Sequence, residues 1–216
     1  MSFQAELERV LPADIPHRAV LVTKAARHLE LVVEVNQYLN LTRITDPHEA
    51  AIKHVLDSVI PWRLFQGARH VMDAGTGPGF PGVPLALVLP DTQFTLAEST
   101  GKKARFVESV AEQLEAGNVT VEARRAEELI REGGYDVITA RAMAPLDKAL
   151  DLFGAALKKG TRALFYKGPD VDREIAEAAM QAKKLHVSLR VAMRYELPAG
   201  FGTRTIVEVS AETGRH

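Results

Sequence analysis

The chain has 216 residues, 46% of them hydrophobic and 25% charged, with a formal net charge of −1 and no cysteine. This is the composition of an ordinary globular protein, and the lack of cysteine excludes disulfides, cysteine-ligated zinc and a thiol nucleophile. A dedicated nucleic-acid binder is usually basic, so any surface for RNA must be local.

The chain also lacks the usual signals for export or membrane insertion. No apolar run approaches the roughly 18 residues that a membrane-spanning helix needs. The first residues, MSFQAELERVL, carry acids where a secretory signal is basic and then apolar. We therefore expect a cytoplasmic protein.

Residues 1–66 have helical patterning. The segment from His17 to Leu39 lacks glycine and proline, and its apolar residues fall roughly on a helical period. Asp46 and Pro47 are a suitable cap and first turn for a second helix that ends near Val59. No convincing strand precedes residue 69. These patterns predict a helical N-terminal extension over residues 1–66.

Beyond residue 69, short apolar runs alternate with helical stretches. The predicted strands are 69–74, 93–97, 119–123, 135–140 and 161–166. The predicted helices are 81–89, 102–116, 126–132, 145–158 and 171–185. This alternation predicts a parallel sheet covered by helices. Two last strands, 187–197 and 205–209, are too close in sequence for a parallel crossover, so this pair should be antiparallel. We predict an α/β domain over residues 67–216 with a seven-stranded, mostly parallel sheet.

A glycine-rich loop, DAGTGPGFPG, follows the first predicted strand. Its G-x-G-x-x-G spacing is typical of dinucleotide sites at the carboxyl ends of strands. Asp73 would repel a pyrophosphate, however, and Pro78 and Pro81 remove two N–H donors that a phosphate would use. S-adenosylmethionine has no phosphate and carries a sulfonium and an ammonium, so a carboxylate suits it. We expect positive φ angles at Gly75, Gly77 and Gly79.

The ends of the next two strands support an adenosyl ligand. Glu98 ends the second strand, where an acid can accept hydrogen bonds from both ribose hydroxyls. The segment Arg125-Ala126-Glu127 follows the third strand and is placed to lie against an adenine ring. The alternatives are a surface acid at Glu98 and an ordinary helix start at Ala126.

These residues belong to a series of motifs that run in order over residues 36 to 209. The motifs are Asn40-Leu41-Thr42, Lys53-His54-x-x-Asp57-Ser58, DAGTGPGFPGVPLA, Glu98-Ser99-x-Gly101-Lys102-Lys103-x-x-Phe106, Arg125-Ala126-Glu127, Thr139-Ala140-Arg141-Ala142 and Tyr166-Lys167-Gly168. The chain therefore resembles the Rossmann-like class I S-adenosylmethionine-dependent methyltransferases. It is most similar to the bacterial small-subunit ribosomal RNA guanine-N7 methyltransferases, the RsmG (GidB) family. It departs from the family pattern at Glu98, where Asp is usual, and at Lys103, where Arg is common.

The resemblance implies a cofactor, a substrate and a site. The cofactor is S-adenosylmethionine, with S-adenosylhomocysteine as product, and no metal is expected. The implied cofactor-binding residues are Asp73, Gly75, Gly77, Gly79, Phe80, Glu98, Ser99, Ala126, Glu127 and Arg141. The substrate is N7 of one guanine in the decoding region of 16S ribosomal RNA. The partner is thus the small ribosomal subunit, with neither DNA nor a membrane involved, and we expect a monomer.

The residues agree with methylation at N7. Methylation of a pyrimidine carbon generally needs a thiol, which is absent, and Thr139-Ala140-Arg141-Ala142 stands where amine methyltransferases carry Asn/Asp-Pro-Pro-aromatic. Guanine N7 has a free lone pair and no proton, so alignment with the methyl group suffices. Arg141 is the predicted catalytic residue, through a contact with guanine O6 or a phosphate. The alternative is a salt bridge to a nearby acid.

Further residues are candidates for RNA contact. They are Asn40, Arg43, His54, Lys102, Lys103, Arg125 and Lys167. His54 and Asp57 share one helix face, where they could instead tie the N-terminal helices to the sheet. Three other functions stay open: a small-molecule methyltransferase, an NAD-dependent oxidoreductase and a non-catalytic adenosyl-binding module.

Overall fold

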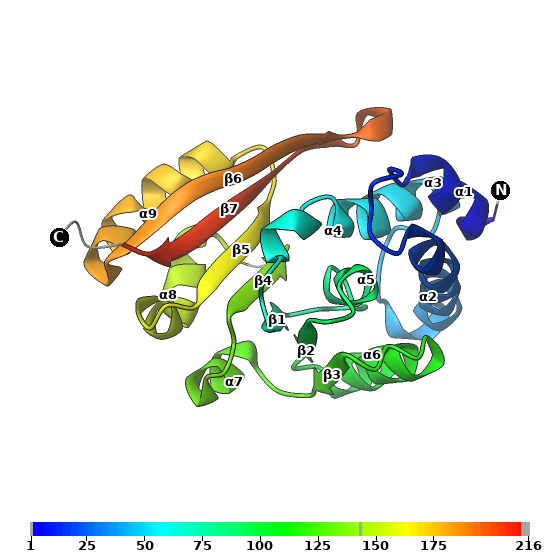
Figure 1. Cartoon of the computed structure of the whole chain (residues 1–216), viewed down its shortest axis with the longest axis horizontal. Helices are drawn as coiled ribbons and strands as arrows, with labels where there is room; N and C mark the ends of the chain where they lie inside the picture. The colour runs from blue at the N-terminus through cyan, green and yellow to red at the C-terminus, as the bar shows by residue number, and fades with distance from the viewer. Residues whose placement is uncertain (1, 143, 213–216) are drawn as a thin grey trace.

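The computed structural model describes residues 2–142 and 144–212 and has one twisted sheet between two layers of helices (Figure 1). The strands are β1 (His70–Ala74), β2 (Gln93–Ala97), β3 (Val119–Glu122), β4 (Val137–Arg141), β5 (Arg162–Lys167), β6 (Val187–Leu197) and β7 (Gly202–Ala211). Their order is β3-β2-β1-β4-β5-β7-β6. Strands β1 to β5 pair in parallel, whereas β7 is antiparallel to both β5 and β6. The predicted α/β class and mostly parallel seven-stranded sheet are confirmed.

The helices of the described residues also follow the predicted order. The N-terminal ones are α1 (Phe3–Val10), α2 (Arg18–Leu39), α3 (Pro47–Ala50), the π-helix η1 (Ala51–Leu56), α4 (Asp57–Val59) and the 3-10 helix η2 (Trp62–Phe65). The later ones are α5 (Gly82–Val88), α6 (Gly101–Gln113), α7 (Ala126–Glu132), α8 (Leu146–Lys158), α9 (Val171–Leu185) and the 3-10 helix η3 (Pro198–Gly200). None of these helices is long and apolar enough to cross a bilayer.

The helix predicted to begin at Asp46 and Pro47 corresponds to α3, η1 and α4, and it contains a π-helical turn. Asp46 caps it, since its side chain accepts a hydrogen bond from the Glu49 N–H at 2.9 Å. Residues 51–56 then form a π-helix between α3 and α4. The Asp57 N–H accordingly donates to the Ile52 carbonyl, five residues back. A periodic sequence pattern cannot reveal this extra residue in the turn, and π-helical turns often occur at functional sites.

Alternate side chains of the central strands pack on opposite faces of the sheet. Val71 and Leu164 join the core beneath α2, α5 and α6, whereas Met72 and Phe165 join the core beneath α7, α8 and α9. The N-terminal helices share the first of these cores with the sheet, and in Figure 1 they lie beside α5 and α6. The division of the chain at residue 66 stays a prediction.

The last two strands form a long hairpin whose tip reaches the N-terminal helices (Figure 1). Phe201, at the tip, lies against the ring of His48 with 6.0 Å between centroids. The Lys53 ammonium sits 4.5 Å from the centre of the Phe201 ring. The hairpin therefore brings residues near 204 to the carboxyl ends of β4 and β5.

Candidate functional site

Asp73 ends β1 and holds the glycine loop together. Its Oδ2 accepts hydrogen bonds from Thr76 Oγ1 at 2.6 Å and from the Gly82 N–H at 2.8 Å. Gly82 is the first residue of α5, so the carboxylate lies where a dinucleotide site would place a phosphate. Burial raises the pKa of Asp73 to about 6. Asp73 therefore acts against a pyrophosphate by position as well as by charge.

Four other amides of the loop donate hydrogen bonds to nearby carbonyls. The N–H groups of Gly75 and Thr76 both donate to Ala97 O, at 2.9 and 3.1 Å. Those of Gly79 and Phe80 both donate to Thr76 O at 3.0 Å. Few donors are thus left for a phosphate. The expected positive φ angles are confirmed at the three glycines, with 72° at Gly75, 58° at Gly77 and 100° at Gly79.

The residues around the loop fit an adenosyl ligand. The pairing of Ala74 with Ala97 places Glu98 at the same sheet edge as the glycine loop. Glu98 Oε1 accepts the Thr100 N–H at 2.7 Å, and among the described residues no group donates to its Oε2. This carboxylate oxygen is available to ribose hydroxyls. The glycine backbone and Glu98 can therefore hold a neutral ribose better than a pyrophosphate.

Three more predicted cofactor residues lie at or near this edge. Ser99 is exposed directly after Glu98, and Ala126 is buried at the start of α7. Glu127 is half-buried, with its carboxylate 3.6 Å from the guanidinium of the exposed Arg125. Their contact with an adenine ring stays a prediction.

Phe80 is stacked between two histidines of the N-terminal helices. The His28 ring lies 4.4 Å from it at 16°, and the His54 ring lies 4.7 Å from it at 9°. His28 Nε2 is 2.8 Å from Pro78 O in the glycine loop. Burial lowers the pKa of His28 to about 4, and burial with repulsion from Arg141 lowers the pKa of His54 to about 3. Two neutral rings thus fasten the loop to α2 and η1.

Sequence reasoning missed His28. It lies on the apolar stripe of α2 together with Ala25, Leu29 and Val32, all buried. A polar residue on a stripe of this kind was the available signal. The implied contact between Phe80 and the cofactor stays a prediction, since Phe80 is only 4% exposed.

Arg141 ends β4 and contacts the N-terminal helices. Its Nη1 donates to Lys53 O at 2.8 Å and pairs with Asp57 Oδ2 at 3.2 Å. The π-helical turn leaves the Lys53 carbonyl accessible, because the Asp57 N–H donates to Ile52 O instead. The salt bridge considered as an alternative role is therefore present. Among the described residues, nothing accepts a hydrogen bond from Nε or Nη2 of Arg141, so these donors are open to a ligand.

Asp57 joins the N-terminal helices to three strands. Besides Arg141 on β4, its Oδ1 accepts a hydrogen bond from Tyr195 Oη on β6 at 2.9 Å. Its Oδ2 lies 3.7 Å from Nε of Arg204 on β7. Burial and the Asp57 charge raise the pKa of Tyr195 above its ordinary value, so this phenol stays a donor. His54 has a different partner, Thr42 Oγ1 at 3.1 Å.

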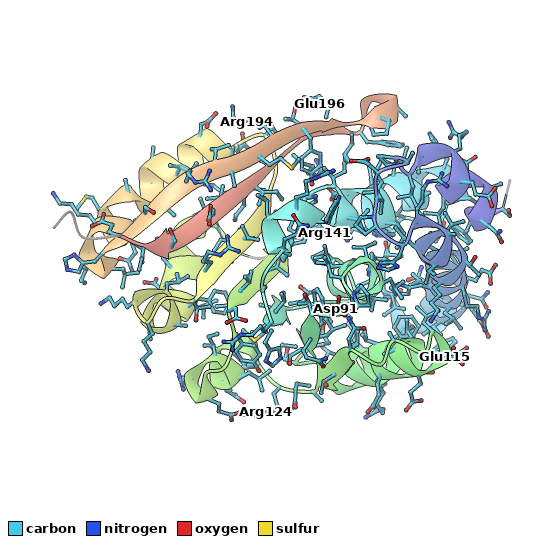
Figure 2. The ribbon with its side chains drawn as sticks, viewed as in Figure 1. Asp91, Glu115, Arg124, Arg141, Arg194 and Glu196 are labelled. Atoms are coloured by element: carbon cyan, nitrogen blue, oxygen red, sulfur yellow. The ribbon has the colours of Figure 1, made fainter. Side chains whose placement is uncertain are left out.

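A cavity of about 470 Å³ opens at the carboxyl ends of β4 and β5. Its lining residues are Ile44, Lys53, His54, Asp57, Arg141, Ala142, Tyr166, Lys167, Gly168 and Arg204. The structure thus brings together the predicted residues Arg141, His54 and Lys167. It adds Lys53 and Arg204, which sequence reasoning missed. In Figure 2, Arg141 lies inside the molecule beside α4.

A larger cavity, of about 910 Å³, lies at the opposite edge of the sheet. It is formed near the amino ends of β1, β4 and β5, beside residues such as Arg69, Tyr135 and Arg162. None of the predicted site residues lines it. Ligands of parallel α/β sheets bind at the carboxyl ends, so we place the functional site at the smaller cavity.

Other predicted RNA contacts come from the segment after α2 and from the start of α6. Asn40 and Arg43 are exposed after α2, and Lys102 and Lys103 lie in the first turn of α6. They do not line the smaller cavity, so their contacts with RNA stay predictions.

Lys167 lines the smaller cavity, but its ammonium is already engaged. Nζ donates to Ala144 O at 2.9 Å and to Glu174 Oε2 at 2.8 Å, and the side chain is 8% exposed. From the sequence we expect a phosphate contact for Lys167. Its partner Glu174 is half-buried, and a contact of Lys167 with an RNA phosphate stays a prediction.

Comparison with known proteins agrees with this geometry. The family described as rRNA small subunit methyltransferase G (GidB) matches residues 21–196. The chain is 60% identical over 209 residues to "Ribosomal RNA small subunit methyltransferase G" of Solibacter usitatus, covering 97% of this chain and 100% of that protein. A protein of the same name from Carboxydothermus hydrogenoformans is 37% identical over 187 residues, covering 84% of this chain and 79% of that one.

Solved structures share the fold. An O-methyltransferase from Bacillus cereus, in complex with SAH, superposes with a TM-score of 0.60 at 20% identity over 96% of each chain. The O-methyltransferase TomG from Streptomyces achromogenes, in complex with SAM, gives 0.58 at 17% identity over 88% of this chain and 90% of that one. By the family match and its relatives, the chain belongs to the rRNA small subunit methyltransferase G (RsmG, GidB) family.

Proposed function

We propose that this protein transfers a methyl group from S-adenosylmethionine to N7 of one guanine in the decoding region of 16S ribosomal RNA. Family membership makes it an S-adenosylmethionine-dependent methyltransferase of small-subunit ribosomal RNA. The observation that carries the finer proposal is the position of Arg141. Its guanidinium lines the cavity, lies 5.7 Å from the centre of the Phe80 ring, and has donors open to a ligand.

The cofactor-binding residues fit the adenosyl group. We propose that Gly75 and Gly77 approach it through their backbone and that Glu98 accepts its ribose hydroxyls. Asp73 keeps the loop closed on α5 and Ala126 borders the adenine. When bound, the cofactor supplies an electrophilic methyl group on sulfur. Proximity and orientation of such reactants can lower a barrier by roughly 7–11 kcal/mol.

The cavity suits a reaction that needs no general base. The Tyr166 hydroxyl donates to Ser58 O at 2.7 Å, and Asp57 is paired with Arg141 and Tyr195. The low pKa of His54 and its bond to Thr42 leave it a weak proton acceptor. Guanine N7 needs no deprotonation, and an arginine fork can bond guanine O6 beside it. We assign this role to Arg141, which holds the base while the methyl group moves in line to N7.

The other basic residues contribute RNA contacts in this proposal. Asn40 and Arg43 follow α2, whereas Lys102, Lys103 and Arg125 follow β2 and β3. Contacts from several separate segments would fix the RNA backbone without reading its sequence. We further propose that the protein acts as a monomer in the cytoplasm. Sedimentation of the purified chain tests whether it is a monomer.

Transfer of labelled methyl groups tests the substrate class. The acceptors are small ribosomal subunits from a strain that lacks this activity, with large subunits and already methylated small subunits as controls. We expect label in the 16S RNA of the first preparation alone. If none of the three preparations is labelled although the protein binds S-adenosylmethionine tightly, the proposal is contradicted. That result would favour a small-molecule substrate or a non-catalytic module.

A further inference from the structure

The cavity carries one cation whose role the family motifs do not assign. Arg204 lies on β7 close to the hairpin tip, and its side chain is 24% exposed. Its Nη1 donates to Thr203 O at 3.1 Å, and its Nε is 3.7 Å from Asp57 Oδ2. Among the residues that the structure describes, no group accepts a hydrogen bond from Nη2 of Arg204. Because Arg204 lines the cavity, its Nη2 is available to a ligand there.

The acceptors near Arg204 are shared. Asp57 Oδ2 already pairs with Arg141 at 3.2 Å, and Asp57 Oδ1 accepts the Tyr195 hydroxyl at 2.9 Å. One carboxylate thus faces two guanidinium groups. Partly desolvated guanidinium donors without acceptors are unfavourable, so the cavity favours a ligand that brings acceptor oxygens.

Lys53 adds a second cation to the lining of this cavity. Its ammonium pairs with Glu49 at 2.6 Å and lies over the Phe201 ring. The side chain is 27% exposed, so an incoming anion can share it with Glu49. Arg204 comes from the hairpin and Lys53 from η1, and both line the same cavity.

We propose that Arg204, assisted by Lys53, binds a phosphodiester of the substrate RNA next to the target nucleotide. A phosphodiester carries one negative charge and offers the paired oxygens that a guanidinium fork matches. The cavity, at about 470 Å³, leaves room for the neighbouring base beside Arg141. This inference rests on the proposed function, because it assumes that the substrate is RNA.

Binding of small subunits at several salt concentrations tests the proposal, with S-adenosylhomocysteine present so that no transfer occurs. Each phosphate contact adds close to one unit to the slope of log affinity against log salt. We expect Arg204→Gln to weaken binding about tenfold and to reduce the slope by about one, whereas Arg204→Lys restores most of the slope. S-adenosylhomocysteine affinity stays unchanged in both variants.

Arg194→Gln is the matched control. Arg194 is on β6, where it opposes Thr205, the neighbour of Arg204. Its guanidinium pairs with Asp172 and not with Asp57, and Figure 2 shows it on the outer side of the hairpin. This variant should leave both affinity and slope unchanged. Equal melting temperatures of the two Gln variants would show that each is folded.

The outcomes separate the two proposals. An Arg204→Gln variant that transfers methyl groups but keeps the affinity and slope of the parent overturns the phosphate contact alone. A parent protein that shows the Arg204 effect on binding but transfers nothing overturns the reaction alone. A parent protein that does not bind small subunits overturns both. A loss of S-adenosylhomocysteine affinity in Arg204→Gln would show that Arg204 acts through Asp57 and Arg141.

Discussion

Arg141 at the end of β4 and Asp57 in the N-terminal helices form an ion pair with 3.2 Å between Nη1 and Oδ2. The Asp57 side chain is 3% exposed and that of Arg141 is 16% exposed. Their separation in sequence is large, so the pair fixes the helical extension to the carboxyl edge of the sheet. The extension thereby forms one wall of the site.

Breaking this pair should destabilise the fold. Asp57→Ala leaves Arg141 and Arg204 without their shared carboxylate, which we expect to lower the free energy of unfolding by about 3 kcal/mol. Urea titration measures the change. The control is Asp14→Ala, which removes an exposed pair with Arg63 and should change stability by less than about 1 kcal/mol. Equal effects of the two substitutions would contradict the account.

The buried histidines make stability depend on pH. In the unfolded chain His28 and His54 protonate near the ordinary pKa of 6.5, whereas in the fold they stay neutral down to about 4 and about 3. Their contribution is thus present above pH 6.5 and is lost as pH falls toward 4. Asp73 has the opposite effect on stability. Its folded pKa of about 6 lies above the ordinary 3.8, so its protonation stabilises the fold as pH falls below 6.

Two histidines outweigh one aspartate, so acid should destabilise the protein. We expect the free energy of unfolding to fall by about 2 kcal/mol between pH 7.5 and pH 5.5. His186→Asn is a suitable control, since His186 is exposed with a φ of 54° that asparagine tolerates. It should leave the difference between the two pH values unchanged. A stability that stays constant or rises on acidification would refute the neutral stack around Phe80.

A side chain at Gly82 should disturb the cofactor loop. A Cβ at this position would lie 2.7 Å from Asp73 Oδ2 and would also overlap the Leu96 side chain. We expect Gly82→Ala to lower stability by about 1–3 kcal/mol and to weaken S-adenosylmethionine binding, measured by calorimetry. Gly117→Ala is the control, because nothing lies within 4 Å of its added Cβ. Unchanged cofactor binding in Gly82→Ala would show that the hydrogen bonds of Asp73 to Thr76 and Gly82 do not shape the site.

The pair between Lys167 and Glu174 can be tested for its role. If the pair is structural, Lys167→Met and Glu174→Gln each lower the melting temperature, because each leaves a buried or half-buried charge without its partner. The salt dependence of small-subunit binding then stays that of the parent. A reduced salt slope in Lys167→Met alone would instead support the phosphate contact predicted from the sequence.

Local features of the fold were predictable from the sequence. The helix start at Asp46 and Pro47 follows from capping, and the positive φ angles of the loop follow from its glycines. The antiparallel pair at the end follows from the short connection between β6 and β7. Each depends on residues close together in the chain.

The features that sequence patterns did not reveal depend on residues far apart in the chain. The His28 ring reaches Phe80 only when α2 packs beside α5. Arg204 enters the cavity only through the reach of the hairpin. The π-helical turn that offers Lys53 O to Arg141 has no periodic signature. Long-range packing therefore brings these residues into the candidate site.

The most direct test of the central claim identifies the methylated nucleoside. Small subunits from a strain lacking the activity are incubated with the enzyme and labelled S-adenosylmethionine, and the digested 16S RNA is analysed by mass spectrometry. We predict 7-methylguanosine at a single position, formed on the order of 100-fold more slowly by Arg141→Ala. A label on an exocyclic amine or a pyrimidine carbon, or full activity without Arg141, would contradict it.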